Sequence, residues 1–479
     1  MIKQAALQAF MVLAAACTAS AQTTAATQTQ KGEASIRGRD AVATVARLSE
    51  KDMAGRMTGQ PGFTVAARWT LSQFQALGLK GQLQQYVQPH SVLDGGKMLA
   101  SVREEKLEAE MLKDFFPLLF SDSGQASGNS VFVGWGIHAP ELGYDDYAGI
   151  DATGKFVICF RGTPDNDTKW VYHDEHRTRM KVASQKGALG LIYVYPSVIA
   201  HPNGDLIPNF FASMISDAYF DKLMAIEEGS TSQELQKQLR ETKRPASFNL
   251  NAHFEVTVKA RHFPKAPGYN AVAWLEGSDP LLKSECVVIG AHLDGVGDHL
   301  GMRFPAAEDN ASGSAVVLEI AKAFAKNGKR PNSTRSVVFA LFGSEEQGGQ
   351  GSAHFVANLP PQFKKMAAFI NFDMVGIGTK LNVGMNSQME KFRELLDSCD
   401  NDLSVLGNIR PIRAIGVRSG DIVPFFNKGV PLVSLSSNGP RPPDLYHLPS
   451  DTPNLVQADL MEKISKLMFR FAHVICELE

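Results

Sequence analysis

The chain has 479 residues, of which 44% are hydrophobic and 20% charged, as in ordinary globular proteins. This length allows two or three domains and a large hydrophobic core. The formal net charge at pH 7 is −2, so no overall field favours nucleic acid or an anionic membrane surface as a partner.

The N-terminus has the pattern of a secretory signal peptide over residues 1–21. A positive residue precedes an apolar run at 5–16, which is too short to cross a bilayer comfortably, and a small-residue cleavage site ends at Ala21. We therefore expect an exported protein, periplasmic or secreted, without a stable membrane span, whose residues 22–35 form a disordered tail. Lipoprotein anchoring at Cys17 is a weaker alternative, because the large aliphatic residue usual three places earlier is missing.

The predicted secondary structure changes twice in the next part of the chain. Apolar residues at helical spacing run from about 36 to 79, with a loop at 55–62, and strands are predicted at 83–88 and 270–275. Between these two strands lie short strands closed by glycine turns, with one helix among them (130–133, 154–162, 181–186 and 190–195). We interpret 105–258 as an inserted β-rich domain, which divides a larger domain into 36–104 and 259–479.

From residue 259 onward, strands and helices alternate as they do in doubly wound α/β proteins. The buried strands are continuous apolar runs, and the clearest helix spans 312–327 (strands at 287–289, 337–342, 367–372 and 431–435). In open sheets of this kind, active sites lie beyond the carboxyl ends of the strands. Those strand ends are therefore where functional side chains are expected.

Polar side chains follow each of these strands. His292, Asp294 and Asp309 come after the first strand; the others are Glu345 and Glu346 after the second, Asp373 after the third and His447 in the loop after the fourth. A single such residue would be interpreted as a histidine with ordinary hydrogen-bond partners, or as a carboxylate at the start of a helix. Their recurrence in order favours a metal site, because two histidines and three carboxylates can bind two divalent metals that share one carboxylate. Asp294 and Glu345 are then left over.

Other chemistries lack their signatures. The sequence contains no G-x-x-x-x-G-K-[ST] phosphate loop and no G-x-S-x-G nucleophile elbow. It also has no C-x-x-C spacing, so thiolate metal binding is not expected, and Cys159 and Cys286 lie in apolar runs typical of buried small residues.

The order of these motifs resembles that of the M28 family of co-catalytic zinc aminopeptidases. The resemblance covers about 270–479 and rests on five motifs: His292-Leu293-Asp294, Asp309-Asn310-Ala311-Ser312-Gly313, Glu345-Glu346, Asn371-Phe372-Asp373-Met374, and Tyr446-His447 with the following Leu448 to Thr452. The inserted segment is similar to a protease-associated (PA) domain, on the runs 146–151, 154–155 and 187–190. Residues 57–62 resemble the N-terminal segment of PA-containing members, which implies a discontinuous peptidase domain.

The resemblance implies a mixed central sheet sandwiched by helices, as in zinc exopeptidases, and two zinc ions per chain. Asp309 would bridge the two ions; His292 and Asp373 would complete one site, and Glu346 and His447 the other. Glu345 would be the general base, and Asp294 would hold the His292 ring by a hydrogen bond. Tyr446 would either donate a hydrogen bond to the oxyanion or serve as a packing residue. Asp451 would hold the His447 loop or serve its turn.

The implied function is removal of N-terminal residues from peptides. One alternative is a carboxypeptidase-type, glutamate-releasing relative on the same scaffold, which would need a basic pocket such as Arg413, Arg418 and Arg441 could supply. A less favoured alternative is a receptor-like binding protein that has lost its metals. Side-chain preference, substrate length and oligomeric state are not readable from the sequence.

Overall fold

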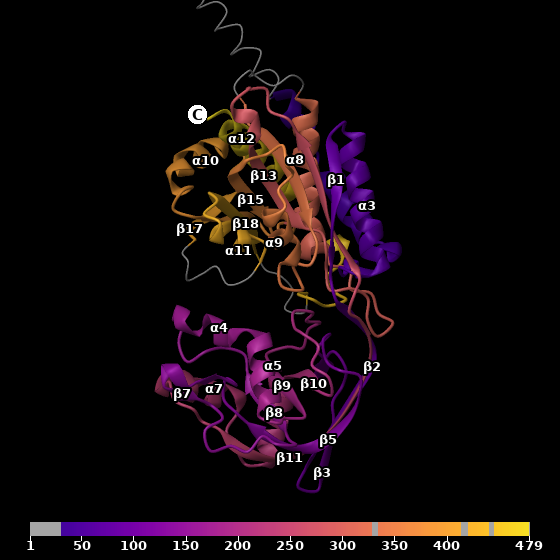
Figure 1. The fold of residues 1–479 in the computed structure, drawn as a ribbon, viewed down its shortest axis with the longest axis vertical. Helices are drawn as coiled ribbons and strands as arrows, with labels where there is room; N and C mark the ends of the chain where they lie inside the picture. The colour runs from indigo at the N-terminus through magenta and orange to yellow at the C-terminus, as the bar shows by residue number, and fades with distance from the viewer. Residues whose placement is uncertain (1–29, 328–333, 413–419, 440–444, 479) are drawn as a thin grey trace, which may run out of the picture.

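The computed structural model describes residues 30–327, 334–412, 420–439 and 445–478, which form two lobes (Figure 1). The main lobe contains both ends of the described chain, and the inserted lobe lies beside the carboxyl ends of the main lobe's parallel strands. The predicted signal peptide and Cys17 lie outside the described residues, so export stays a prediction. Within the described ranges, no helix combines the length and apolarity needed to cross a membrane.

The main lobe is built on a mixed eight-stranded sheet among the described residues. The strand order is β1 (Lys80–Val87), β12 (Pro267–Leu275), β14 (Ser336–Phe342), β13 (Glu285–His292), β15 (Lys365–Phe372), β18 (Leu432–Asn438), β16 (Lys380–Met385) and β17 (Leu406–Pro411). The central strands β14, β13, β15 and β18 are parallel. β14 is buried along its whole length, because its apolar run needs cover on both faces. The predicted mixed sheet is confirmed.

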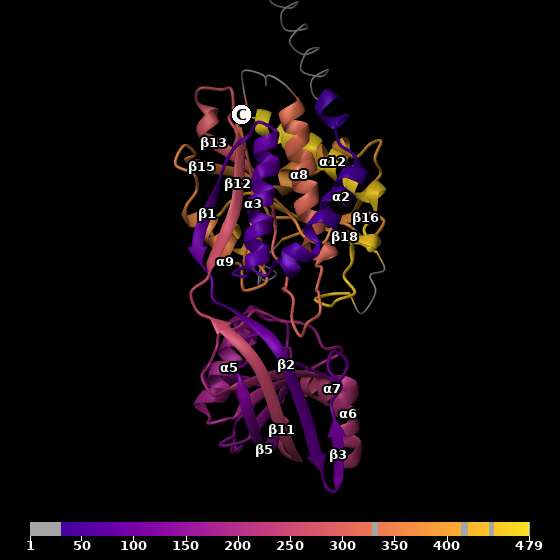
Figure 2. The same cartoon turned by 90° about the vertical axis from the view of Figure 1, so that its right-hand side faces the viewer.

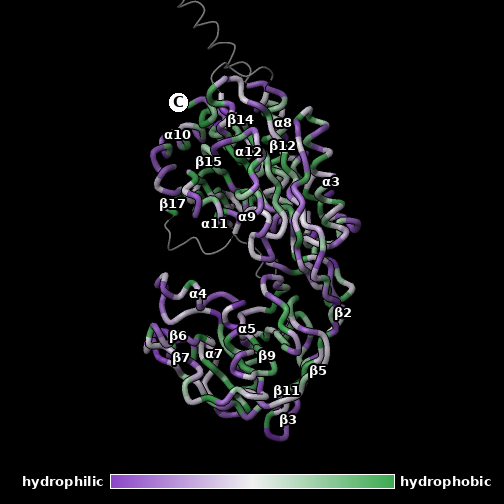
Figure 3. The backbone as a smooth tube through the Cα atoms, viewed as in Figure 1, coloured by the Kyte–Doolittle hydropathy of each residue, from purple (hydrophilic) through white to green (hydrophobic). Residues whose placement is uncertain are grey.

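Helices cover the two faces of this sheet. One core gathers α2 (Gly38–Leu48), α3 (Pro61–Ala76), α8 (Ser312–Lys326) and α12 (Ala458–Glu477), which Figure 2 shows side by side. The other core gathers α9 (Gln350–Ala357) and α11 (Ile422–Asn427), and α10 (Arg393–Cys399) packs on α12. Figure 3 shows the hydrophobic stretches gathered inside each lobe. The helix predicted at 312–327 is confirmed, with Asn327 at its C-cap.

The described chain becomes regular before the predicted end of the disordered tail. Residues 30–33 are helical, whereas we expected disorder over 22–35. Glu33 forms an ion pair with Arg470 of α12 at 2.6 Å, and Gly32 packs against Phe469. These contacts, which come from the far end of the sequence, order the last residues of the expected tail.

The inserted lobe is also larger than the sequence indicated. Its sheet runs β3 (Glu105–Glu108), β2 (His90–Val102), β11 (Phe248–Phe263), β5 (Gly124–Phe132), β8 (Phe156–Phe160), β9 (Gly190–Tyr195), β10 (Phe211–Ser216) and β4 (Phe115–Pro117). The helices α4 (Val171–Asp174), α5 (His176–Gln185), α6 (Asp217–Ile226) and α7 (Ser232–Thr242) complete it. Because β2 pairs with β11 from His90↔Phe263 to Val102↔Ala252, the lobe begins near residue 88 and ends near 266, rather than spanning 105–258.

A buried carboxylate organises one end of the inserted lobe. Asp146 is fully buried and accepts hydrogen bonds from the amides of Trp135 (3.1 Å) and Ile137 (3.0 Å) and from the hydroxyl of Tyr144 (3.0 Å). Burial raises the pKa of Asp146 to about 7, although these hydrogen bonds oppose the shift. The lobe therefore keeps a proton here that the unfolded chain loses at lower pH.

This shift predicts how stability depends on pH. An acid with a raised folded pKa favours the unfolded state once the unfolded chain ionises, so the free energy of unfolding should fall from about pH 4 to 7, by at most about 4 kcal/mol, and then level off. Asp146→Asn should remove this slope, because an amide oxygen still accepts from both backbone amides. Urea unfolding of both proteins across this range measures it, and an equal slope in the variant contradicts the assignment.

Candidate metal centre

The structure brings the predicted polar residues together at the carboxyl ends of the parallel strands. His292 ends β13, Glu345 and Glu346 follow β14, and Asp373 follows β15. His447 lies in the loop after β18, and Asp309 lies in residues 307–311, just before α8. Their ligand atoms fall into groups within 4.8 Å of one another: His292 with Asp309 and Asp373, Asp309 with Glu346 and His447, and His292 with Glu345 and Glu346.

Asp309 belongs to two of these groups through different oxygens. Its Oδ1 lies 3.2 Å from Nε2 of His292, and its Oδ2 lies 3.4 Å from Nε2 of His447. Nε2 of His292 is also 3.5 Å from Oδ1 of Asp373, and Nε2 of His447 is 2.8 Å from Oε2 of Glu346. One carboxylate thus faces two separate nitrogen–oxygen sets.

The distances and the donor atoms fit metal ligation. Ligands bound at about 2.0–2.1 Å in tetrahedral geometry lie about 3.3 Å apart, whereas charge-assisted hydrogen bonds are about 2.7–2.9 Å long. Three of the four separations above match the ligand spacing; the contact between His447 and Glu346 is shorter. Oε1 of Glu346 is buried and has no hydrogen-bond partner among the described residues. Imidazole and carboxylate ligands of this kind suit zinc.

The carboxylate of Asp294 has a different role from the one predicted. Its Oδ1 lies 3.8 Å from Nδ1 of His292, and the ring instead donates to the main-chain oxygen of Asp294 at 3.2 Å. The carboxylate accepts from the amides of Glu345 (3.2 Å) and Glu346 (3.3 Å), so it holds the neighbouring loop. The reason is sheet order: β13 and β14 are parallel neighbours, which brings the two loops together.

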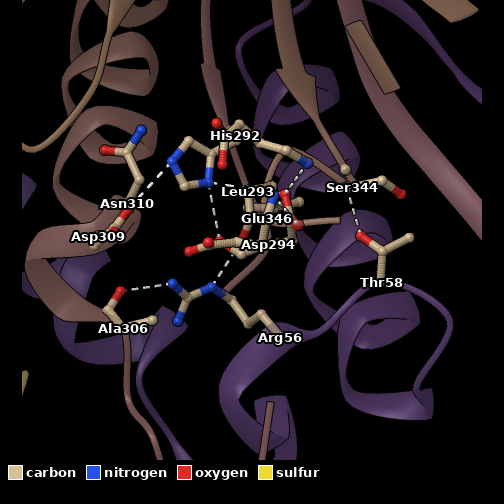
Figure 4. A network of polar contacts seen from close by, with 12 residues as sticks. Arg56, Thr58, His292, Leu293, Asp294, Ala306, Asp309, Asn310, Ser344 and Glu346 are labelled. Atoms are coloured by element: carbon tan, nitrogen blue, oxygen red, sulfur yellow. Dashed lines mark hydrogen bonds and ion pairs between the residues drawn. The ribbon is translucent and has the colours of Figure 1, made fainter. Parts of the chain in front are cut away.

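Arg56 is the residue that sequence reasoning missed (Figure 4). Its guanidinium is fully buried beneath the site and donates to the main-chain oxygens of Leu293 (2.8 Å), Ala306 (2.7 Å), Pro305 (2.8 Å) and Leu48 (2.8 Å). Burial lowers the pKa of Arg56 to about 10, against the pull of nearby carboxylates, so it stays charged at neutral pH. Arg56 thus supplies a fixed cation beside the carboxylate cluster.

The segment that carries Asp309 is held from two sides. The carboxylate of Asp451 accepts from the amides of Glu308 (2.8 Å) and Asp309 (3.1 Å), which joins the His447 loop to this segment. The side chain of Asn310 donates to the main-chain oxygen of Phe372 at 2.9 Å, at the end of β15. Asp451 therefore does more than make a turn, because it ties two candidate ligands together.

The carboxyl groups of Asp309 and Glu345 have pKa values shifted in opposite directions. Burial would raise the pKa of Asp309, but the rings of His292 and His447 hold it well below its usual value. Burial raises the pKa of Glu345 well above its usual value. The nearby His292 ring opposes this shift, and the carboxylate of Glu346 adds to it. Their surroundings therefore shift the pKa values of Asp309 and Glu345 in opposite directions.

A cleft of about 600 Å³ leads to this centre from between the lobes. Glu345, Glu346, Tyr446 and His447 line it from the main lobe, and Arg161, Asp174, Glu175, His176, Arg177 and His201 are among its residues from the inserted lobe. The Tyr446 ring stacks on His447, with centroids 3.8 Å apart, and its side chain is 46% exposed. Arg413, Arg418 and Arg441 lie outside the described residues.

A mixed sheet covered by helices, with two candidate ligand sets that share a carboxylate at its strand ends, is the arrangement that a two-metal hydrolase requires. Residues 270–472 match the model of Peptidase family M28, and this range includes every candidate ligand. Over these residues the chain is similar to peptidase family M28.

Curated and solved relatives agree with this assignment. The chain is similar to leupeptin-inactivating enzyme 1 of Streptomyces exfoliatus, with 34% identity over 39% of this chain and 40% of the relative. It is also similar to an aminopeptidase of Pseudomonas aeruginosa, with 27% identity over 67% of this chain and 54% of the relative, so it spans about half the length of these relatives. An Aneurinibacillus aminopeptidase structure shares the fold (TM-score 0.65, 20% identity, 93% and 95% covered).

Proposed function

We propose that this protein is an aminopeptidase that binds two zinc ions and removes N-terminal residues from peptides. The observation that carries the proposal is the position of Asp309, whose two oxygens face His292 and His447 at 3.2 and 3.4 Å. The match of residues 270–472 to peptidase family M28 and the names of the relatives support an N-terminal specificity.

We assign the metal ligands by these groups. His292 and Asp373 would hold one zinc, Glu346 and His447 the other, and Asp309 would bridge both. When bound, the ions supply Lewis-acid activation of water and of the scissile carbonyl. Arg56 and the hydrogen bonds to Asp294 keep the loops that carry the ligands in place.

Glu345 is placed to move the proton. It lies at the inner wall of the cleft, in one ligand-distance group with His292 and Glu346. As an ionised carboxylate, Glu345 would take a proton from the attacking water and deliver it to the leaving amine. Tyr446, half exposed in the same cleft, would either donate its hydroxyl to the oxyanion that develops on the substrate or serve to pack on His447.

A substrate panel tests this function. The purified protein should hydrolyse aminoacyl-p-nitroanilides that have a free amine, should leave N-acetylated analogues intact, and should contain about two zinc ions per chain by elemental analysis. Removal of the metal with a chelator should abolish turnover, and zinc should restore it. Release of C-terminal residues from N-blocked peptides would instead support the carboxypeptidase-type alternative, and metal below one ion per chain would exclude the two-metal centre.

A further inference from the structure

The inserted lobe reaches one of the candidate metal ligands directly. The β9–β10 loop (residues 196–210) passes beside His447, and Nδ1 of that ring donates to the main-chain oxygen of Ala200 at 2.8 Å. The amide of Ala200 donates in return to the main-chain oxygen of His447 at 3.2 Å. Ala200 is fully buried, so these two hydrogen bonds are shielded from water.

This pair of bonds fixes both the ring and its backbone. A carbonyl oxygen can only accept, so Nδ1 of His447 carries a proton and Nε2 is the nitrogen that faces Asp309 and Glu346. The backbone of His447 is left-handed (φ 56°), a conformation that a residue with a side chain rarely adopts without support. Ala200 supplies that support from the inserted lobe.

A second contact from the inserted lobe lies next to Glu346, the other candidate ligand of the same site. Arg177 of α5 donates to Asp205 at 2.8 Å and to Asn203, which anchors the β9–β10 loop. The same guanidinium donates to the main-chain oxygen of Gln347 at 3.3 Å, one residue beyond Glu346. The inserted lobe therefore contacts the main lobe at His447 and at Gln347, the residue after Glu346.

The other site is held by the main lobe. The ring of His292 donates to the main-chain oxygen of Asp294, and the amide of Asp373 donates to Leu435. Both partners lie in the sheet or its adjoining loops. The two sites are thus supported by different parts of the chain.

We infer that the inserted lobe completes one of the two metal sites, the site formed by His447, Glu346 and Asp309. Ala200 is the positioning residue that holds the His447 ring for that metal. The inference rests on the proposed function and goes beyond it, because it gives the lobe selective control over one of the two metals. Docking of the lobe and occupancy of that site should therefore be linked and reciprocal.

Ala200→Val tests this inference, because two added methyl groups at a fully buried position should displace the loop from His447. Ala212→Val is the matched control: Ala212 is equally buried in the same lobe, on β10, and makes no hydrogen bond to the centre. Metal affinities come from calorimetric titration of the metal-free proteins with zinc and from the absorption bands of bound cobalt. In Ala200→Val one of the two affinities should fall about 10–100-fold, with the other unchanged. The control should match the unmodified protein.

Hydrogen exchange of the unmodified protein gives an independent readout if Ala200→Val does not fold. Zinc at saturation should slow exchange of the loop peptide that contains Ala200, while β5 (Gly124–Phe132) of the same lobe exchanges as before. If both metal affinities are the same in the two variants, or if zinc leaves loop exchange unchanged, the inference is overturned while the two-metal centre stands. An unmodified protein that binds a single metal overturns the two-metal centre and the inference with it.

Discussion

Replacing Glu345 with glutamine is expected to lower kcat for an aminoacyl-p-nitroanilide by about 10²–10⁴-fold, the usual contribution of a general base. The amide keeps the size of the side chain but cannot take a proton from water. The metal content should stay unchanged, because Glu345 belongs to neither of the ligand sets that share Asp309. Steady-state kinetics together with elemental analysis measure both effects.

A second variant controls for the loss of a carboxylate as such. Glu285 lies at the opposite end of β13, where it forms ion pairs with Arg335 and Lys365. Glu285→Gln should leave kcat within about twofold, since surface ion pairs contribute little. If Glu345→Gln turns over substrate as fast as this control, Glu345 is not the base. If it loses metal, Glu345 is a ligand.

Arg56→Met is expected to destabilise the fold by about 3–5 kcal/mol, because it removes a buried cation and leaves four buried carbonyl oxygens without their donor. Methionine fills much of the same volume, so the lost polar interactions dominate the change. The free energy of unfolding in urea, measured on the metal-free protein, reports this effect without any contribution from bound zinc.

Arg47 provides the comparison for this variant. It lies in α2, where its half-buried side chain pairs with Glu50 at 2.9 Å and Asp52 at 2.7 Å near solvent. Arg47→Met should cost about 1 kcal/mol or less, as surface ion pairs do. Similar losses for Arg56→Met and Arg47→Met would contradict the assignment of Arg56 as the buried tie beneath the metal centre.

The candidate ligands could be predicted from the sequence, because a polar side chain at the end of a continuous apolar strand stands out against its surroundings. His292, Glu346 and Asp373 all follow such runs, and the structure brings their ligand atoms within 4.8 Å of shared partners. Arg56 gave no comparable signal. Its partners are main-chain oxygens, which every residue carries, so no pair of residue types indicates the contact.

The limits of the inserted lobe were missed for a related reason. β2 contains Asp94-Gly95-Gly96 in its middle, a run typical of a turn, so the sequence did not indicate a long strand. Pairing with β11 overrides this local preference, with a register shift between Lys259 and Ala260 that leaves Asp94 without a partner beside the glycines. The direction of the Asp294 carboxylate also depends on which strands are neighbours, which the spacing of residues along the chain does not contain.

The two ends of the inserted lobe meet at the junction between the lobes. β1 and β12 are antiparallel neighbours that end at the pair Val87↔Pro267, and the amide of Gln88 donates to Ala266 at 2.8 Å where the chain crosses. Residues 88–266 therefore occupy the place of a hairpin turn. Because the two ends of the insertion already lie side by side, the lobe could be gained or lost in evolution without shifting the register of the main sheet. A shortened chain closed by a tight turn would keep all five proposed ligands and would lose the carbonyl of Ala200 that orients His447.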